Sequence, residues 1–404
     1  MSQKRPELLI PASSLEVLKT AVMFGADAVY IGGEAFGLRA KAKNFSMEDM
    51  KEGVRFAHDH GARVHVTVNI LAHNDDLEGA AEYLKELKEI GPDALIIADP
   101  AIFMLAKEIC PEIERHVSTQ ANNTNYGTFN FWWNLGAKRV VTARELSLKE
   151  IKEIRAHIPE EMEIESFIHG AMCISYSGRC LLSNFFTGRD ANQGACTHPC
   201  RWKYSVVEET RPGEYMPVYE NERGTYIFNS KDLCMIEHIP EMIDAGIDSF
   251  KIEGRMKTAL YVATVARTYR KAIDDYLESP EKYKANMPWY QEQISNCTYR
   301  QFTTGFFYGK PDQNTQIYDN NTYVKEYTYL GYAHITQRNK FSVGETIEIM
   351  KPDGRNLSVK VRAIYDENGE SVESAPHPQQ KLAVDLGTEI EKYDLLRRAE
   401  ASEN

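Results

Sequence analysis

Short apolar runs alternate with longer amphipathic stretches over the first 280 residues of the chain. The first run, ELLIPAS at residues 7–13, is followed by an amphipathic stretch at residues 14–25. The next run, AVYIGG at residues 28–33, leads into a second amphipathic stretch at residues 46–61. Short apolar runs predict buried strands, and amphipathic stretches of this length predict helices.

Glycine marks the joints at which a predicted helix ends and the next predicted strand begins. Five joints share this feature, at Gly25, Gly61, Gly91, Gly136 and Gly246. Glycine is favoured there because it takes the left-handed conformation that ends a helix. Later strands are expected at residues 116–120, 139–144, 163–169 and 249–253. The resulting eight strand–helix steps predict an α/β fold with a parallel sheet closed into a TIM-like (β/α)8 barrel.

A long insertion interrupts this pattern after the seventh predicted strand. It covers residues 170–235 and is expected to contain a hairpin formed by residues 204–209 and 225–230. Loops that follow the strands of a barrel build its functional site, so an insertion here predicts a site. The expected domains are a barrel with its Cys-rich insertion, a linker and a small antiparallel β-barrel, at residues 1–300, 301–321 and 322–404.

The charge of the chain is uneven. Its net charge of −12 disfavours loose binding to nucleic acid, but Arg179, Arg189, Arg201 and Lys203 make the insertion locally basic. The sequence shows neither a signal-peptide pattern nor an apolar run long enough to span a membrane. We therefore expect a cytoplasmic protein without membrane contact, in which thiols stay reduced and clustered cysteines bind metal or do chemistry.

Four of the seven cysteines lie within residues 169–203: Cys173, Cys180, Cys196 and Cys200. Only the last two have the close spacing that is typical of zinc ligands, whereas iron–sulfur clusters accept wider spacings. Cys234 is a fifth candidate ligand from the returning end of the insertion. A metal or cluster site is favoured over a disulfide or unrelated thiols, with iron–sulfur ahead of zinc. Cys110 and Cys297 are expected in the core.

Polar residues stand at the carboxyl ends of the predicted strands, where a barrel carries its active site. The candidates for catalytic roles are His169, Glu34, Arg144 and Glu253. The candidates for ligand binding are Asn69, Gln120, Lys251 and Arg255, joined by Arg179 and Arg201 from the insertion. Arg144, Arg255 or Lys251 could hold a small dicarboxylate through charge-assisted hydrogen bonds.

The segment ESFIHGAMCISYSGRCLLSNFFTGRDANQGACTHPCRWKY resembles the signature of the collagenase-like peptidase family of unknown catalytic type. In that signature a strand ends in His-Gly, followed by a Cys, a Ser-Gly-x-Cys and an Asn-x-Gly-x-Cys. The segments ELLIPAS, GADAVYIGG, STQANNTN, NSKDLC, SFKIEGRMK and FTTGFFYG also match, so the resemblance covers nearly the whole chain.

The resemblance implies a function and a cofactor. Chain length and the C-terminal domain are most similar to the branch implicated in hydroxylating the wobble uridine of certain tRNAs to 5-hydroxyuridine. That reaction proceeds without molecular oxygen and depends on prephenate. In cluster-binding relatives, the ligands match Cys173, Cys180 and Cys196, which implies a 4Fe–4S cluster. The fourth ligand matches Cys234 in some members, with the position of Cys200 as the alternative.

Two other functions stay open at this point. The family name implies a peptidase, although the sequence holds no GxSxG, HExxH or evident Cys–His–Asn arrangement. Some relatives pair with a homologue, so a homo- or hetero-oligomeric assembly with a scaffolding role is the third reading. RNA hydroxylation is favoured because a hydrolase has no need of a cluster-like set of cysteines.

Overall fold

The computed structural model describes most of the chain. The described residues are 4–33, 36, 44–172, 182–187, 197, 205–206, 216–217, 231–254, 257–309, 327–332, 336–378 and 380–400. Among them, no helix is both long enough and apolar enough to cross a membrane.

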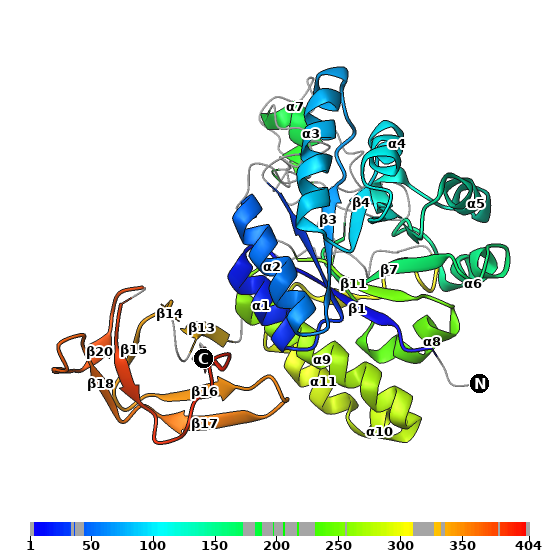
Figure 1. Cartoon of the computed structure of the whole chain (residues 1–404). Coiled ribbons are helices and arrows are strands. Elements are labelled where there is room, and N and C mark those ends of the chain that lie inside the picture. Colours follow the sequence, from blue (N-terminus) through cyan, green and yellow to red (C-terminus); the bar gives the residue numbers. More distant parts are fainter. Residues whose placement is uncertain are drawn as a thin grey trace.

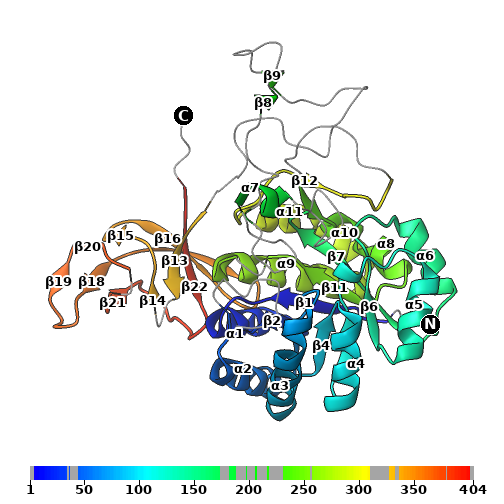
Figure 2. The same cartoon turned by 90° about the horizontal axis from the view of Figure 1, so that it is seen from above.

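Eight parallel strands form a closed barrel, so the predicted fold class is confirmed (Figures 1 and 2). They are β1 (Glu7–Pro11), β2 (Ala28–Gly32), β3 (Arg63–Val68), β4 (Ala94–Ile97), β5 (Glu114–Val117), β6 (Arg139–Val141), β7 (Glu163–Gly170) and β11 (Ser249–Ile252). The barrel closes because β11 pairs with both β1 and β7, where Ser249 lies opposite Glu7 and Glu165. Most residues of β1, β2 and β4 are apolar because both faces of these strands are buried, which explains the hydrophobic runs of the sequence.

Helices surround the barrel (Figure 2). They are α1 (Leu15–Met23), α2 (Met47–Asp59), α3 (Asn74–Ile90), α4 (Pro100–Ile109), α5 (Tyr126–Leu135), α6 (Leu148–Ala156), α8 (Ile239–Asp244) and α9 (Ala259–Glu278). The predicted glycine stops are present, since Gly91 and Gly136 end α3 and α5 in the left-handed conformation, with φ of 72° and 100°. Two further helices that the sequence pattern missed, α10 (Pro280–Ala285) and α11 (Met287–Ser295), follow α9.

The insertion leaves from the end of β7 and returns beside it. Its described elements are α7 (Leu182–Thr187), β8 (Ser205–Val206), β9 (Met216–Pro217) and β10 (Asp232–Cys234). β10 runs antiparallel to β7, and β12 (Phe302–Thr303) pairs with β10. The first strand of the expected hairpin contains β8, which pairs with β9. The second expected strand, residues 225–230, lies outside the described part of the chain. Part of the expected linker thus extends the barrel sheet.

The C-terminal region consists of antiparallel sheets, as the sequence predicted. Its strands are β13 (Tyr327–Tyr332), β14 (Thr336–Gln337), β15 (Phe341–Ser342), β16 (Thr346–Met350), β17 (Asn356–Lys360), β18 (Ala363–Tyr365), β19 (Ser371–Val372), β20 (Ser374–Ala375), β21 (Ala383–Asp385) and β22 (Leu395–Ala399). This region lies beside α1 and α9 (Figure 1). The contact is partly polar: Arg267 donates to the carbonyl of Lys351 at 3.0 Å, and Arg338 pairs with Glu16 at 2.8 Å.

Candidate functional site at the carboxyl end of the barrel

The pairing of β10 with β7 fixes Cys234 at the carboxyl end of the barrel. Cys234 lies opposite His169, four residues before the first cysteine of the insertion. A buried ion pair anchors the start of β10, because Arg300 donates to Asp232 at 2.7 Å. The strand therefore holds Cys234 beside the end of β7. Cys173 follows that end in the sequence. Both residues belong to the predicted ligand set.

The Cys234 thiol is half-buried and lies near the carboxylates of Asp232 and Glu237. Its sulfur lies 3.7 Å from the Tyr269 hydroxyl, which belongs to α9. Burial raises the pKa of Cys234 to about 11, so the free thiol is protonated at neutral pH. A bound metal deprotonates the thiol that coordinates it. The position fits a cluster ligand for two reasons. A neutral thiol costs little folding free energy when no metal is bound, and Cys234 lies beside the end of β7, after which the cysteine-bearing loop follows in the sequence.

His169 is packed rather than open. Its side chain is 1% exposed, and its ring lies against those of Tyr261, Tyr269 and Phe302. The Tyr269 hydroxyl lies 3.3 Å from its Nδ1. Burial lowers the pKa of His169 to about 4, so the imidazole is neutral. The sequence predicted a catalytic group at this position. The structure places the His169 side chain on the face of β7 that packs against α9.

Arg144 and Glu253, two of the candidate catalytic residues, lie close together at the carboxyl end of the barrel. The Arg144 guanidinium donates to the carbonyl of Ala171 at 2.9 Å, lies 4.1 Å above the Phe167 ring and is 3.8 Å from the Glu253 carboxylate. It lines a small pocket with Thr142, Ala143, Phe167, Met172, Leu233, Phe306 and Phe307. A cation on an apolar wall suits an anionic ligand, because a low dielectric strengthens their attraction.

A polar cluster joins the ends of β3 and β5. The Ser118 hydroxyl contacts both Asn69 Nδ2 and Gln120 Oε1 at 3.5 Å. Gln120 is 2% exposed, and its Nε2 has no hydrogen-bond partner among the described residues. Side-chain amides both donate and accept hydrogen bonds, which is what reading the edge of a base requires. The structure places both amides at the carboxyl end of the barrel, and their role in binding stays a prediction.

Lys251 lies deeper than the sequence suggested. It is 4% exposed, and its Nζ donates to Glu165 Oε1 at 2.6 Å. Its ammonium also lies 4.6 Å from the Tyr30 ring and 5.3 Å from the Phe167 ring, inside the barrel. Among the expected dicarboxylate-binding cations that the structure describes, Arg144 is therefore the one at the rim.

The remaining predicted residues lie outside the described part of the chain. They are Glu34, Cys173, Arg179, Cys180, Cys196, Cys200, Arg201 and Arg255.

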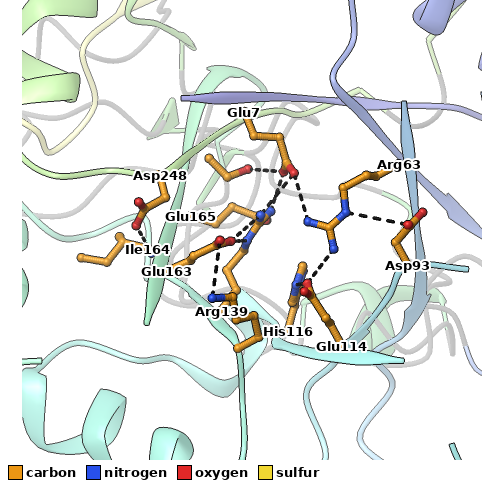
Figure 3. Close-up of polar contacts among 12 residues, drawn as sticks. Glu7, Arg63, Asp93, Glu114, His116, Arg139, Glu163, Ile164, Glu165 and Asp248 are labelled. Carbon is orange, nitrogen blue, oxygen red and sulfur yellow. Dashed lines mark hydrogen bonds and ion pairs between the residues drawn. The ribbon is translucent and has the colours of Figure 1, made fainter. Parts of the chain in front are cut away.

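The opposite end of the barrel carries a buried charge network that the sequence reading missed (Figure 3). Arg139 contacts Glu7, Glu163 and Glu165 at 2.5, 2.6 and 3.1 Å, respectively. Arg63 pairs with Glu114 at 2.6 Å. One signal could have revealed the network: charged residues and histidines stand two positions apart in RVHVTV (Arg63, His65), ERHV (Glu114, His116) and EIES (Glu163, Glu165), which places each pair on one face of its strand.

Comparison with known families gives two matches that together cover most of the chain. The family described as "Peptidase family U32" matches residues 13–317. The "Peptidase family U32 C-terminal domain" matches residues 320–397. The first match covers the barrel from α1 onward together with its insertion, and the second covers most of the antiparallel sheets.

Curated relatives align over nearly the whole length. A Bacillus subtilis (strain 168) protein named "tRNA hydroxylation protein P1" is 42% identical, over 98% of this chain and 95% of the relative. The Escherichia coli (strain K12) "tRNA hydroxylation protein P" is 38% identical, over 98% of this chain and 97% of the relative. The E. coli "23S rRNA 5-hydroxycytidine C2501 synthase" is 33% identical, over 95% of this chain and 57% of the relative.

Proposed function

The chain belongs to peptidase family U32, and we propose that it is an RNA-modifying enzyme that hydroxylates tRNA. The observation that carries this proposal is the 42% identity to a tRNA hydroxylation protein over 98% of the chain. A relative named as an rRNA 5-hydroxycytidine synthase supports hydroxylation of a pyrimidine base as the shared chemistry. The identity extends through the barrel, the insertion and the C-terminal sheets, so it includes every part of the chain that would bind the RNA.

The proposed product is 5-hydroxyuridine at the wobble position, formed without molecular oxygen and with prephenate as co-substrate. Prephenate is a dicarboxylate, and Arg144 offers a guanidinium on the wall of an otherwise largely apolar pocket. A bidentate guanidinium–carboxylate pair is strong and directional. Glu253, 3.8 Å from Arg144, would orient that guanidinium toward the ligand.

The target base would be read by neutral groups. A uridine flipped out of its stack needs partners for the hydrogen-bonding edge and an apolar surface for its face. Asn69 and Gln120 would supply the partners, since Gln120 Nε2 has no protein acceptor among the described residues. Phe306 and Phe307, in the pocket wall beside Arg144, would exclude water from the ring.

We propose a 4Fe–4S cluster held by Cys173, Cys180, Cys196 and Cys234, with Cys200 as the alternative fourth ligand. The support is that β10 brings Cys234 opposite His169, next to the start of the cysteine-bearing loop. Such a cluster supplies electron transfer when bound. The protein's contribution is the enclosure: Tyr269 contacts the Cys234 sulfur and His169 and would keep water from this side.

The test of the function is the modification state of tRNA in a strain that lacks the gene. Mass spectrometry of the digested tRNA should show loss of 5-hydroxyuridine, restored by the wild-type gene. Unchanged 5-hydroxyuridine in the deletion strain would refute the proposal, provided that no second copy of the gene is present. The cofactor has its own test, because anaerobically purified protein should contain iron and absorb broadly in the visible range, whereas zinc without such absorption would refute the cluster.

A peptidase activity is the second candidate, favoured only by the family description. The hydrogen bonds of His58, His116, His169 and His238 that the structure describes go to carboxylates and tyrosine hydroxyls. A histidine that activates a nucleophile would instead contact a serine, threonine or cysteine side chain. Cleavage of casein or gelatin that is lost in His169→Ala and kept in Cys173→Ala would favour this candidate.

A further inference from the structure

The interior of the barrel holds a second group of metal-binding side chains, far from the cysteines. His65 on β3, His116 on β5 and Glu165 on β7 are all completely buried. Their ligand atoms all lie within 4.8 Å of one another. Each residue is the third of its strand, so the three side chains form one interior layer toward the amino end of the barrel. Figure 3 shows His116 and Glu165 next to the charge network.

The histidines of this layer are short of partners. Neither ring nitrogen of His65 has a hydrogen-bond partner within the described structure, and neither does Nδ1 of His116. A buried imidazole without partners costs free energy, so an unpaired group of this kind calls for an additional bound species. Burial also lowers the pKa of both histidines well below the usual value. Both rings are therefore neutral, which is the form that coordinates metal.

Glu114 forms a hydrogen bond with His116, an arrangement that is common for histidines that bind metal. Its carboxylate lies 3.1 Å from His116 Nε2. Nε2 must carry the proton of that hydrogen bond, so the unprotonated nitrogen is Nδ1, the one without a partner. A carboxylate behind a histidine fixes the tautomer and strengthens the ligand in known metal centres.

Glu165 can serve as a ligand while keeping its present contacts. Its two oxygens accept hydrogen bonds from Lys251 at 2.6 Å and Arg139 at 3.1 Å. An ionised carboxylate has about four lone-pair positions, so these two contacts leave room for a third partner.

We propose that His65, His116 and Glu165 form a closed binding site for one divalent transition-metal ion, with zinc as the best match. Two imidazole nitrogens and one carboxylate are a ligand set that zinc prefers, and a water molecule completes a tetrahedron. Tetrahedral zinc needs about 3.3 Å between ligand atoms, so small side-chain rotations would close the site. The role is structural, because the ligands tie together β3, β5 and β7 and none of them reaches solvent.

The site is separate from the cysteine site. Glu165 and His169 are four residues apart on β7, which corresponds to about 13 Å along a strand. The proposal therefore does not depend on the proposed RNA chemistry.

The test measures zinc directly in full-length protein. Cells are grown with added zinc, and the purified protein is dialysed against EDTA. We expect about one zinc per chain by mass spectrometry of the metal, with X-ray absorption showing nitrogen and oxygen neighbours near 2.0 Å and no sulfur near 2.3 Å. His65→Asn should lose this zinc, whereas His60→Asn, at an exposed histidine after α2, should keep it.

Three results would overturn the proposal: no stoichiometric zinc or other divalent ion in wild type, a sulfur shell around the zinc, or unchanged zinc with the same nitrogen and oxygen shell in His65→Asn. If His65→Asn does not fold, the X-ray absorption spectrum of wild-type protein still shows whether zinc has nitrogen and oxygen or sulfur neighbours. Failure of this test leaves the hydroxylation assay untouched, because that assay reads tRNA and not zinc.

Discussion

The two ends of the barrel both carry a buried or half-buried arginine, but the surroundings of the two guanidinium groups differ. At the amino end, Arg139 is 2% exposed and is held by three carboxylates. At the carboxyl end, Arg144 lies 3.8 Å from the Glu253 carboxylate and lines a pocket. Barrel enzymes concentrate chemistry at the carboxyl end and stability at the amino end. A charge enclosed by fixed partners stabilises the fold, and a charge beside a pocket remains able to bind a ligand.

The largest expected effect is at the carboxyl end and concerns activity alone. Cys234→Ser should reduce hydroxylation by at least about 100-fold, because it removes a proposed cluster ligand. Iron content should fall with it, while the unfolding midpoint of the cluster-free protein changes little. Cys297→Ala is the matched control, since Cys297 is a buried thiol that donates to the Ile294 carbonyl at 3.0 Å. Equal loss in both variants would show that Cys234 acts only through packing.

The next effect is at the amino end and concerns stability alone. Arg139→Met should lower the free energy of unfolding by about 3–5 kcal/mol, because it leaves Glu7, Glu163 and Glu165 without their common partner. Urea unfolding of the purified protein measures it. The fraction that stays folded should keep its hydroxylation rate and its iron. A stability change below about 1 kcal/mol would contradict the role assigned to the network.

A smaller effect is expected at the rim. Arg144→Met should raise the KM for prephenate by about 10- to 100-fold, the loss expected for one charge-assisted hydrogen bond. Stability should change by less than about 1 kcal/mol. Steady-state kinetics measure the first quantity, with Arg338→Met as control, because Arg338 pairs with Glu16 in the contact with the C-terminal region. An unchanged KM would remove Arg144 from the binding site.

The smallest effect is on pH dependence. Burial raises the pKa of Glu7, but Arg139 outweighs burial and holds that pKa well below its usual range. A carboxyl with a depressed pKa stabilises the fold fully above its unfolded value of about 4.3, and this contribution is lost as the pH falls below it. Between about pH 5 and pH 3, the stability of wild type should therefore fall more steeply than that of Glu7→Gln.

The control for this comparison is Glu82→Gln, because Glu82 is an exposed residue that pairs only with Lys85 in the next turn of its helix. Its pH profile should follow that of the wild type. Parallel profiles for wild type and Glu7→Gln would show that Arg139 does not depress the pKa of Glu7.

The sequence predicted the barrel because each of its helices and strands is encoded by residues that are neighbours in the chain. A glycine such as Gly91 ends a helix through its own backbone, and the apolar run that follows can only be buried. The return of the chain at Cys234 was also visible, since NSKDLC ends the insertion. By contrast, β12 is two residues long and pairs with a strand about seventy residues away, so no local pattern marks it.

The depth of a residue within the barrel could not be predicted, because it depends on strand register. Lys251, which the sequence analysis offered as a dicarboxylate-binding cation, lies opposite Leu9 and Phe167, and this register places it below the rim. The interior layer of His65, His116 and Glu165 arises from three strands in the same way. The spacing of each strand shows which face a residue occupies, and only the assembled barrel shows which residues meet.

The most direct test of hydroxylation is to reconstitute the reaction. Anaerobically purified protein is loaded with iron and sulfide, mixed with prephenate and with tRNA from the deletion strain, and the tRNA is analysed by mass spectrometry. We predict the mass of one added oxygen atom on the wobble uridine, with wild type and not with Cys234→Ser. Cluster-loaded protein that leaves the tRNA unchanged, or equal product from both proteins, would contradict the account.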